Sequence, residues 1–207
     1  MNFYGGTMTK AEQTRQFIIE KSAPIVNKKG MAATSLTDIM DVTRLTKGGI
    51  YGNFDSKDEI CQAAFGHLSG QLAAYLDQRV SKGRSAKEKL YNILAFYEGR
   101  EQVEGGCPLL NFGVEADDTH PVVRDMVKRA ILNAQRRIAA IMQAGIANGE
   151  IAAELDAEAF SVKLFALLEG AILVRRVMRD NTQMRMVVAA IKSEFERYLM
   201  TSAPSSS

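Results

Sequence analysis

Apolar side chains recur three and four residues apart along most of this chain, which is the spacing of one face of an α-helix. The clearest run covers residues 56–82, with Ile60, Leu68 and Leu76 on its apolar side. Strand-like alternation of apolar and polar residues is scarce, and the chain has only 4 prolines to interrupt helices. The pattern predicts an all-α fold of about nine helices.

Residues that favour helix starts and stops divide the rest of the chain into segments. Thr9 and Glu12 form a capping box for a first helix that ends before Gly30. Pro24 lies inside this helix and predicts a kink or an early end, because proline removes a backbone hydrogen bond. Apart from two short helices between residues 35 and 53, helices are expected over 56–82, 85–101, 107–115, 121–147, 156–179 and 182–200.

Two short helices separated by a turn are predicted between residues 35 and 53, and this unit can place a helix in the major groove of DNA. Ser35 begins the first helix, and Thr46 begins the second. Gly48 and Gly49 near the start of the second helix cost about 1 kcal/mol each relative to alanine. Helix stability alone would not select them, whereas their lack of bulk lets the backbone approach DNA closely.

Hydroxyl groups, helix N-termini and basic or aromatic side chains surround this pair of helices. Such groups bind DNA phosphates, which positions a protein on the duplex but conveys little sequence information. The predicted DNA-binding residues are Thr34, Ser35, Arg44, Thr46, Lys47, Gly48, Gly49, Tyr51, Asn53 and Lys57.

The stretch from Gly30 to Ile60 closely resembles the N-terminal motif of the tetracycline-repressor (TetR) family of regulators. Its sequence is GMAATSLTDIMDVTRLTKGGIYGNFDSKDEI. The resemblance rests on a combination of residues at fixed spacing, since no single piece of it is specific. The matching positions are Gly30, Thr34, Ser35, Ile39, Thr46, Lys47, Gly48, Ile50, Tyr51, Phe54, Ser56, Lys57, Glu59 and Ile60.

The chain departs from the family pattern at the turn and in the second short helix. Thr43 and Arg44 stand where the family usually has a small residue and glycine. Arg44 therefore implies either a strained backbone or a slightly different turn, and it is a candidate for an additional DNA contact. Asn53 replaces the usual histidine, and Gly49 replaces a commoner threonine. These departures leave the base-reading side chains open but do not affect the expected fold.

The resemblance implies a homodimer whose two recognition helices enter successive major grooves of a pseudo-palindromic operator. It also implies a small-molecule effector that binds among the C-terminal helices and releases the operator. We therefore expect a ligand-responsive transcriptional regulator that acts as a repressor. The expected organisation is a helix-turn-helix DNA-binding domain over residues 1–55, a helical effector-binding and dimerisation domain over 56–201, and a disordered tail over 202–207.

An effector pocket needs apolar walls with a few polar groups, and the middle of the chain offers both. The segment GGCPLLNF, residues 105–112, resembles a stretch found in one branch of the family. For each single residue, ordinary core packing is the alternative. The candidate ligand-binding residues are Phe96, Tyr97, Cys107, Asn111, Phe112, Met126, Met142 and Phe165.

The last two predicted helices carry apolar stripes that would form a four-helix bundle across a two-fold axis. The alternative is that the same residues form core within one chain. The predicted dimer-interface residues are Leu164, Leu168, Ile172, Val188, Ile191 and Phe195.

Composition excludes several classes of protein. A net charge of +2 does not indicate a polycation, so any DNA-binding charge must be local. Cys61 and Cys107 are the only cysteines and are far apart in sequence, so neither a disulfide framework nor a zinc site is expected. No run approaches the roughly 18 apolar residues of a membrane span, and Met1–Thr9 lack a signal-peptide pattern, so we expect a cytoplasmic protein.

Three alternatives to a repressor differ in how well the sequence supports them. An enzyme is disfavoured, because no nucleophile-base pair, HExxH motif or phosphate-binding glycine loop is present, and no cofactor or metal is expected. A helical interaction module that no longer binds DNA is compatible with the balanced charge. A thiol-based sensor regulator would use Cys107, although nothing basic in the sequence stands beside it to activate the thiol.

Overall fold

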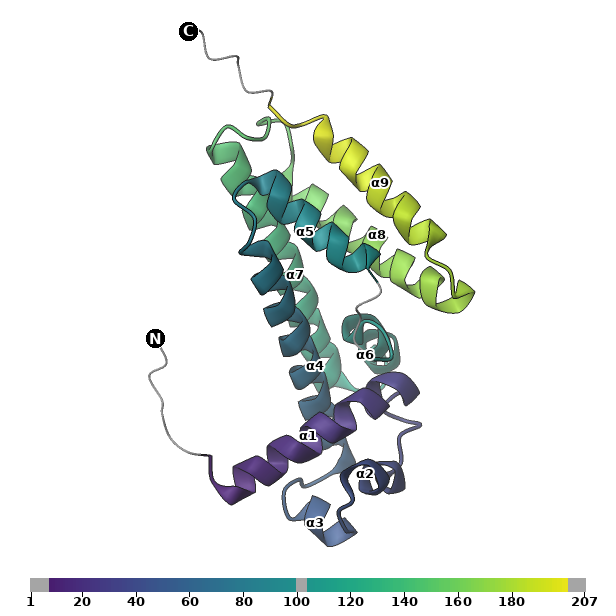
Figure 1. Cartoon of the computed structure of the whole chain (residues 1–207). Helices are drawn as coiled ribbons and strands as arrows, with labels where there is room; N and C mark the ends of the chain where they lie inside the picture. The colour runs from purple at the N-terminus through teal and green to yellow at the C-terminus, as the bar shows by residue number, and fades with distance from the viewer. Residues whose placement is uncertain (1–7, 100–103, 201–207) are drawn as a thin grey trace, which may run out of the picture. The chain divides into compact units, whose positions relative to one another are not determined.

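The computed structural model describes residues 8–99 and 104–200. Within these residues the fold consists of nine α-helices without a β-sheet, which confirms the predicted all-α class (Figure 1). The predicted disordered tail, residues 202–207, lies outside the described residues. The helices are α1 (Lys10–Lys29), α2 (Leu36–Thr43), α3 (Lys47–Tyr51), α4 (Lys57–Val80), α5 (Ala86–Glu98), α6 (Pro108–Ala116), α7 (Pro121–Ala147), α8 (Ala157–Met178) and α9 (Thr182–Glu196).

The described residues form two compact units. The first contains residues 8–71 and 104–127, and the second contains residues 72–99 and 128–200. The division therefore falls inside two long helices, α4 and α7, each of which contributes residues to both units. The expected boundary between residues 55 and 56 stays a prediction.

The first unit is built on a small apolar core under α1 to α4. Its buried side chains are Ile18, Ile39, Ile50, Phe54 and Ile60, each at most 2% exposed. Helix α1 begins at the predicted capping box and continues through Pro24 to Lys29, so the predicted early end does not occur. Because the short helices α2 and α3 bury few residues of their own, this shared core is what holds them in place.

Helix α6 also belongs to the first unit, although it lies far from α1 in sequence. It packs against α1, and the ring centroids of Phe112 and Phe65 are 5.2 Å apart. The side-chain amide of Asn111 donates to the backbone oxygen of Asn27, at 3.0 Å, and to that of Gly105, at 2.8 Å. Apolar and polar contacts together therefore attach α6 to α1 and α4.

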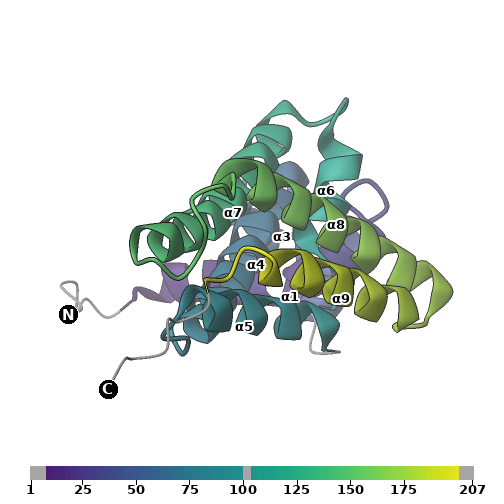
Figure 2. The same ribbon diagram turned by 90° about the horizontal axis from the view of Figure 1, so that it is seen from above.

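In the second unit, α9 packs against both α5 and α8 (Figure 2). The rings of Phe160 and Phe195 meet with centroids 5.9 Å apart. A single antiparallel β-bridge between Ile151 and Leu199 joins the segment before α8 to the segment after α9. These contacts bury the inward faces of α8 and α9 inside one chain.

The burial of these helix faces changes the assignment of the six predicted dimer-interface residues. All of them are at most 3% exposed within the single chain, so their side chains already have their packing partners. The stripe that the sequence showed on α8 and α9 is the intrachain core, which was the alternative. The residues reassigned from the dimer interface to the core of the single chain are Leu164, Leu168, Ile172, Val188, Ile191 and Phe195.

Candidate nucleic-acid interface

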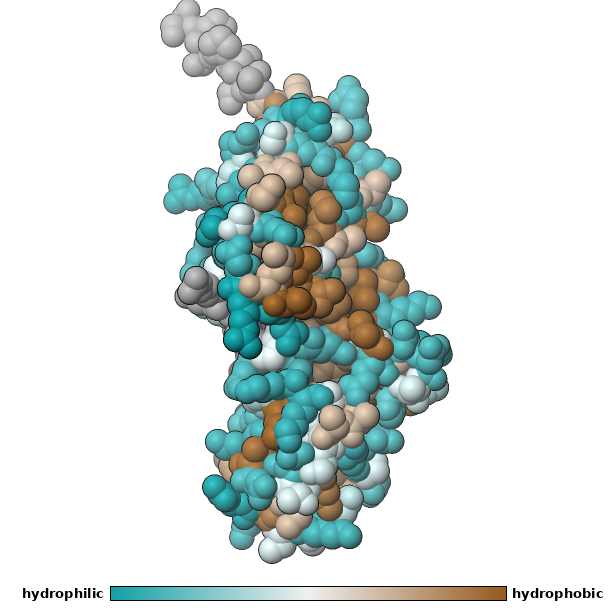
Figure 3. Space-filling model, turned by 90° about the vertical axis from the view of Figure 1, so that its right-hand side faces the viewer, coloured by the Kyte–Doolittle hydropathy of each residue, from teal (hydrophilic) through white to brown (hydrophobic). Residues whose placement is uncertain are grey.

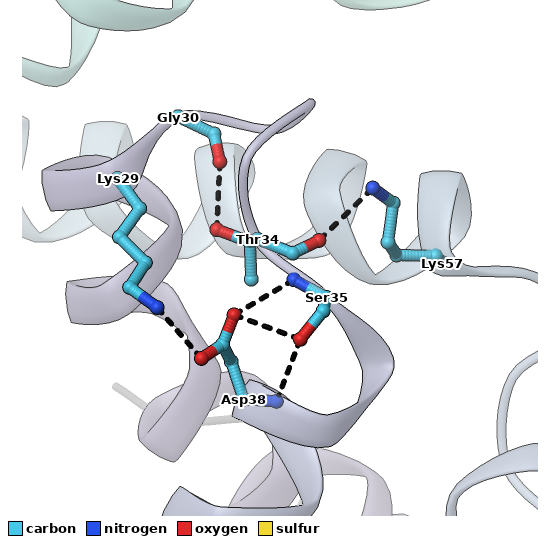
Figure 4. Close-up of polar contacts among 6 residues, drawn as sticks. All are labelled: Lys29, Gly30, Thr34, Ser35, Asp38 and Lys57. Carbon is cyan, nitrogen blue, oxygen red and sulfur yellow. Dashed lines mark hydrogen bonds and ion pairs between the residues drawn. The ribbon is translucent and has the colours of Figure 1, made fainter.

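The start of α2 is fixed by a capping box that the sequence indicated. The Ser35 hydroxyl accepts from the Asp38 backbone N–H at 3.1 Å, and the Asp38 carboxylate accepts from the Ser35 N–H at 2.9 Å. Lys29 adds an ion pair to Asp38 at 2.6 Å (Figure 4). The hydrogen bonds from Lys29 and Ser35 lower the pKa of Asp38 to about 2, so this cap is charged at neutral pH.

The turn between α2 and α3 has an unusual backbone. Arg44 has φ 59° and ψ 23°, which is the left-handed conformation that glycine adopts more readily than any other residue. Its N–H still donates to the oxygen of Met40, at 2.8 Å, and its side chain is exposed. Of the two alternatives drawn from the sequence, the strained backbone is therefore the one present.

Helix α3 presents its N-terminal end to solvent. Thr46 caps it by accepting from the Gly49 N–H at 3.2 Å, and Ile50 is buried in the core below. Lys47 and Gly48 are exposed, and Tyr51 is 40% exposed. Apart from its chain neighbours and the backbone of α3, a Cβ atom built on Gly48 would meet only the Thr46 hydroxyl, at 4.0 Å, so packing does not require a bare surface there.

The opposite end of α3 is held by Arg15 of α1, which sequence reasoning missed. Its guanidinium donates to the oxygen of Asn53 and to the Glu59 carboxylate, the latter at 2.5 Å. It also lies 4.0 Å from the centre of the Phe54 ring. The hydrogen bonds from the Asp55 N–H and from Arg15 lower the pKa of Glu59, so the pair remains charged at neutral pH. Because no short-range motif pairs these residues, the sequence carried no signal for this contact.

Besides Ser35 and Thr46, three more of the ten predicted DNA-binding side chains form hydrogen bonds within the protein. Thr34 is fully buried and its hydroxyl donates to the Gly30 oxygen at 2.6 Å. The Lys57 ammonium donates to the oxygen of Met31, at 2.9 Å, and to that of Thr34, at 3.0 Å (Figure 4). The Asn53 amide donates to the Gly49 oxygen at 2.9 Å. These side chains position the reading head, by which we mean residues 30–57, comprising α2, α3 and the loops on either side of them.

The predicted effector residues divide equally between the two units. Cys107, Asn111, Phe112 and Met126 belong to the first unit, and Phe96, Tyr97, Met142 and Phe165 belong to the second. The Asn111 amide is engaged with Asn27 and Gly105, which is a structural role. The effector assignment of all eight residues stays a prediction.

A cavity of about 240 Å³ in the first unit involves none of these eight residues. It lies between the first turns of α4 and α7, and burial raises the pKa of the Cys61 thiol in its wall to about 11. A thiol with so high a pKa is unreactive at neutral pH. The lining residues are Met31, Asp58, Cys61, Gln62, Thr119, His120, Pro121, Val122 and Val123.

The described residues contain neither a metal-binding cluster nor a helix that could span a membrane. No three His, Cys, Asp or Glu side chains in residues 8–99 and 104–200 are grouped so as to hold a metal ion. Over the same residues, every helix is too short or too polar to cross a membrane.

Two capped helices, joined by a tight turn and resting on a shared core, with the N-terminal end of the second exposed, define a helix-turn-helix DNA-binding protein. Comparison with known families agrees. Residues 18–64 match the model of bacterial regulatory proteins of the tetR family, and residues 86–191 match that of the tetracyclin repressor-like C-terminal domain. The chain belongs to the tetR family of bacterial regulatory proteins and is a DNA-binding transcriptional regulator.

Individual relatives are similar over most of their length. The HTH-type transcriptional regulator TtgR of Pseudomonas putida is 28% identical, over 82% of this chain and 82% of its own. A TetR-family regulator from Cytophaga hutchinsonii has a crystal structure that superposes with a TM-score of 0.91, at 35% identity, over 95% of this chain and all of its own. The crystal structure of a TetR regulator from Chloroflexus aurantiacus superposes with a TM-score of 0.88, at 29% identity, over 94% of this chain and all of its own.

Proposed function

We propose that this protein is a homodimeric repressor that binds a pseudo-palindromic operator through α2 and α3 and is released by a small-molecule effector. The observation that carries the proposal is the exposed N-terminal end of α3, with Lys47 and Gly48 uncovered and Arg44 exposed in the turn before it. A helix enters the major groove by such an end, and exposed cations beside it neutralise phosphates. A cysteine mutant of the regulator CifR, which has the same fold at 18% identity, has a solved structure in complex with double-stranded operator DNA.

The dimer contact that we propose uses the outward face of α8. Val162, Leu173 and Val177 are 50%, 49% and 75% exposed in the single chain. Ala166 and Gly170 lie between them at helical spacing and are also exposed. Small residues within an apolar stripe allow two helices to approach closely, so this face suits a second copy of itself across a two-fold axis.

Helix α9 extends the same apolar surface. Met186 is 65% exposed, and Ala189 and Ala190 beside it are exposed as well. Figure 3 shows apolar surface gathered on the side of the molecule where α8 and α9 lie. Exposed apolar patches of this kind mark interfaces, which supports a four-helix contact formed by α8 and α9 of two chains.

Operator binding is tested in a fluorescence anisotropy titration at low salt, with labelled DNA from upstream of the protein's own gene. We expect saturable binding that weakens steeply as salt rises, because phosphate contacts release counterions. A shuffled sequence of equal length is the control and should bind much more weakly. Binding that is absent at low salt, or equal for both sequences, would contradict the proposal.

The effector is sought by thermal shift over a panel of small apolar and amphipathic compounds. A compound that binds the folded protein raises its melting temperature by mass action. Each such compound is then added to the operator complex. An effector is expected to raise the melting temperature of the free protein and also to weaken operator binding, since the two equilibria are linked. If every stabilising compound leaves operator affinity unchanged, effector release is wrong.

A further inference from the structure

The loop between α1 and α2, residues 30–35, sets where α2 begins. Thr34 is buried, and its N–H and hydroxyl both donate to the Gly30 oxygen, at 3.1 and 2.6 Å. Ser35 then caps α2. Any displacement of this loop would therefore displace the first turn of α2, which we expect at the DNA backbone.

The backbone of this loop is held from two directions by charged side chains from distant helices. Glu115 of α6 accepts from the N–H groups of Met31 and Ala32, each at 2.6 Å. Lys57 of α4 donates to the oxygens of Met31 and Thr34, at 2.9 and 3.0 Å. The carboxylate holds backbone donors and the ammonium holds backbone acceptors, so the loop lies in a clamp of opposite charges.

Gly30 is needed for the carboxylate to reach the loop. Its φ is +91°, and a Cβ built on it would lie 2.9 Å from one oxygen of Glu115 and 3.2 Å from the other. A side chain at Gly30 would therefore meet the Glu115 carboxylate as well as a strained backbone. The Glu115 carboxylate therefore occupies the space that a side chain at position 30 would need, so the contact between Glu115 and the loop depends on Gly30.

A second polar contact fixes α6 so that Glu115 is aimed at the loop. The Asn27 amide donates to the oxygens of Glu104 and Gly106, at 2.7 and 3.0 Å, and the Asn111 amide donates back to the Asn27 oxygen. Asn111 and Glu115 are four residues apart on α6 and so face the same side of that helix. Both contacts lie in the first compact unit.

We propose that Glu115 is a positioning residue for the DNA site. Through this residue α6 would help to hold the loop before α2 in the position that DNA binding requires. The proposal rests on the proposed function, because it assumes that α2 and α3 bind the operator. Glu115 lies in the stretch that matches the family's C-terminal domain model, residues 86–191, yet its contacts are with the loop that begins α2. It acts on DNA only through that loop.

The sign of the affinity change separates positioning from simple electrostatics. Removing a negative charge from a DNA-binding protein strengthens its attraction to phosphates. Replacing Glu115 by glutamine removes one charge but also loses charge-assisted hydrogen bonds to the loop. We expect Glu115→Gln to weaken operator binding by about tenfold, which is the scale of one such bond. Glu115→Asp keeps the charge but shortens the side chain, and it should weaken binding in the same direction.

Asp118→Asn is the matched control, because Asp118 is exposed, lies in the same unit and undergoes the same change of charge. It should leave operator affinity unchanged or slightly raised. Hydrogen exchange of the Met31 and Ala32 amides gives a readout independent of DNA. In the native protein these two amides should be protected, and in Glu115→Gln they should exchange faster while the amides of α8 and α9 do not change.

The outcomes distinguish the two proposals. If the native protein binds no operator, the proposed function fails, whatever Glu115 does. If the native protein binds but Glu115→Gln binds equally or more tightly, Glu115 does not position the DNA site. If a variant does not fold, protection in the native protein decides, and unprotected Met31 and Ala32 amides would overturn the inference.

Discussion

Arg44 shows how a single residue departs from what stability alone would select. A left-handed conformation costs a non-glycine residue about 1–2 kcal/mol, although glycine has greater freedom to lose on folding. We expect Arg44→Gly to raise the free energy of unfolding by about 0.5–1 kcal/mol, measured by urea denaturation. We expect the same variant to bind operator more weakly, because the exposed guanidinium is lost. Unchanged affinity would remove Arg44 from the DNA contacts.

Lys57 has both a partner within the protein and a predicted partner on DNA. Two of its three N–H donors are directed at backbone oxygens of the α1–α2 loop, and the third remains for a phosphate. Lys57→Ala should lower the melting temperature and weaken binding to operator and to shuffled DNA alike.

The salt dependence of this variant tests the phosphate contact. The slope of log affinity against log salt should fall in magnitude by about 1 for one lost phosphate contact. Lys192→Ala, an exchange of the same type in α9 of the second unit, should leave the slope unchanged. A native-like slope for Lys57→Ala would confine that lysine to holding the loop.

At the scale of the element, α3 is a helix of 5 residues that begins with a lysine and two glycines. Glycine in a helix costs about 1 kcal/mol relative to alanine, and the space around the Gly48 position is open. Gly48→Ala should therefore raise the free energy of unfolding by about 1 kcal/mol and weaken operator binding, because its methyl group would stand between the backbone and DNA.

The matched control lies in α4. A Cβ on Gly70 would meet nothing within 4 Å outside its own helix backbone, and Gly70 is exposed in the same unit. Gly70→Ala should raise stability by a similar amount and leave operator affinity unchanged. If Gly48→Ala stabilises the protein without weakening binding, close approach of the backbone at Gly48 is not part of recognition.

At the scale of the whole molecule, the two faces of α8 have different roles. Leu168 is 2% exposed and packs inside the chain, whereas Leu173 is 49% exposed. Leu173→Glu should give a folded monomer, because it places a charge in the proposed contact between chains. Leu168→Glu should unfold the protein or strongly destabilise it, because it buries a charge without a partner.

Sedimentation and far-ultraviolet circular dichroism, measured together, test this assignment. Leu173→Glu is expected to sediment as a monomer with native helix content, and Leu168→Glu to lose helix content. A Leu173→Glu protein that remains dimeric would place the interface elsewhere.

Local signals allowed most elements to be predicted. Capping residues act over three or four positions, so Thr9, Ser35 and Thr46 fixed the starts of α1, α2 and α3. The departure at Arg44 was also visible in the sequence, because the family pattern usually has glycine at this position. The early end that Pro24 indicated does not occur, since packing of α1 against α2 and α6 outweighs one missing hydrogen bond.

The fold class, the family resemblance and the place of the reading head could be predicted from the amino-acid sequence, because each depends on periodicity and on contacts a few residues apart. Which face of α8 and α9 is core became clear from the folded chain, since an apolar stripe packs equally well within a chain or between chains. The tertiary structure alone joined Glu115 to Met31, which are 84 residues apart, and Arg15 to Glu59, which are 44 apart. Contacts at such separations are set by the packing of whole helices, and no local pattern encodes them.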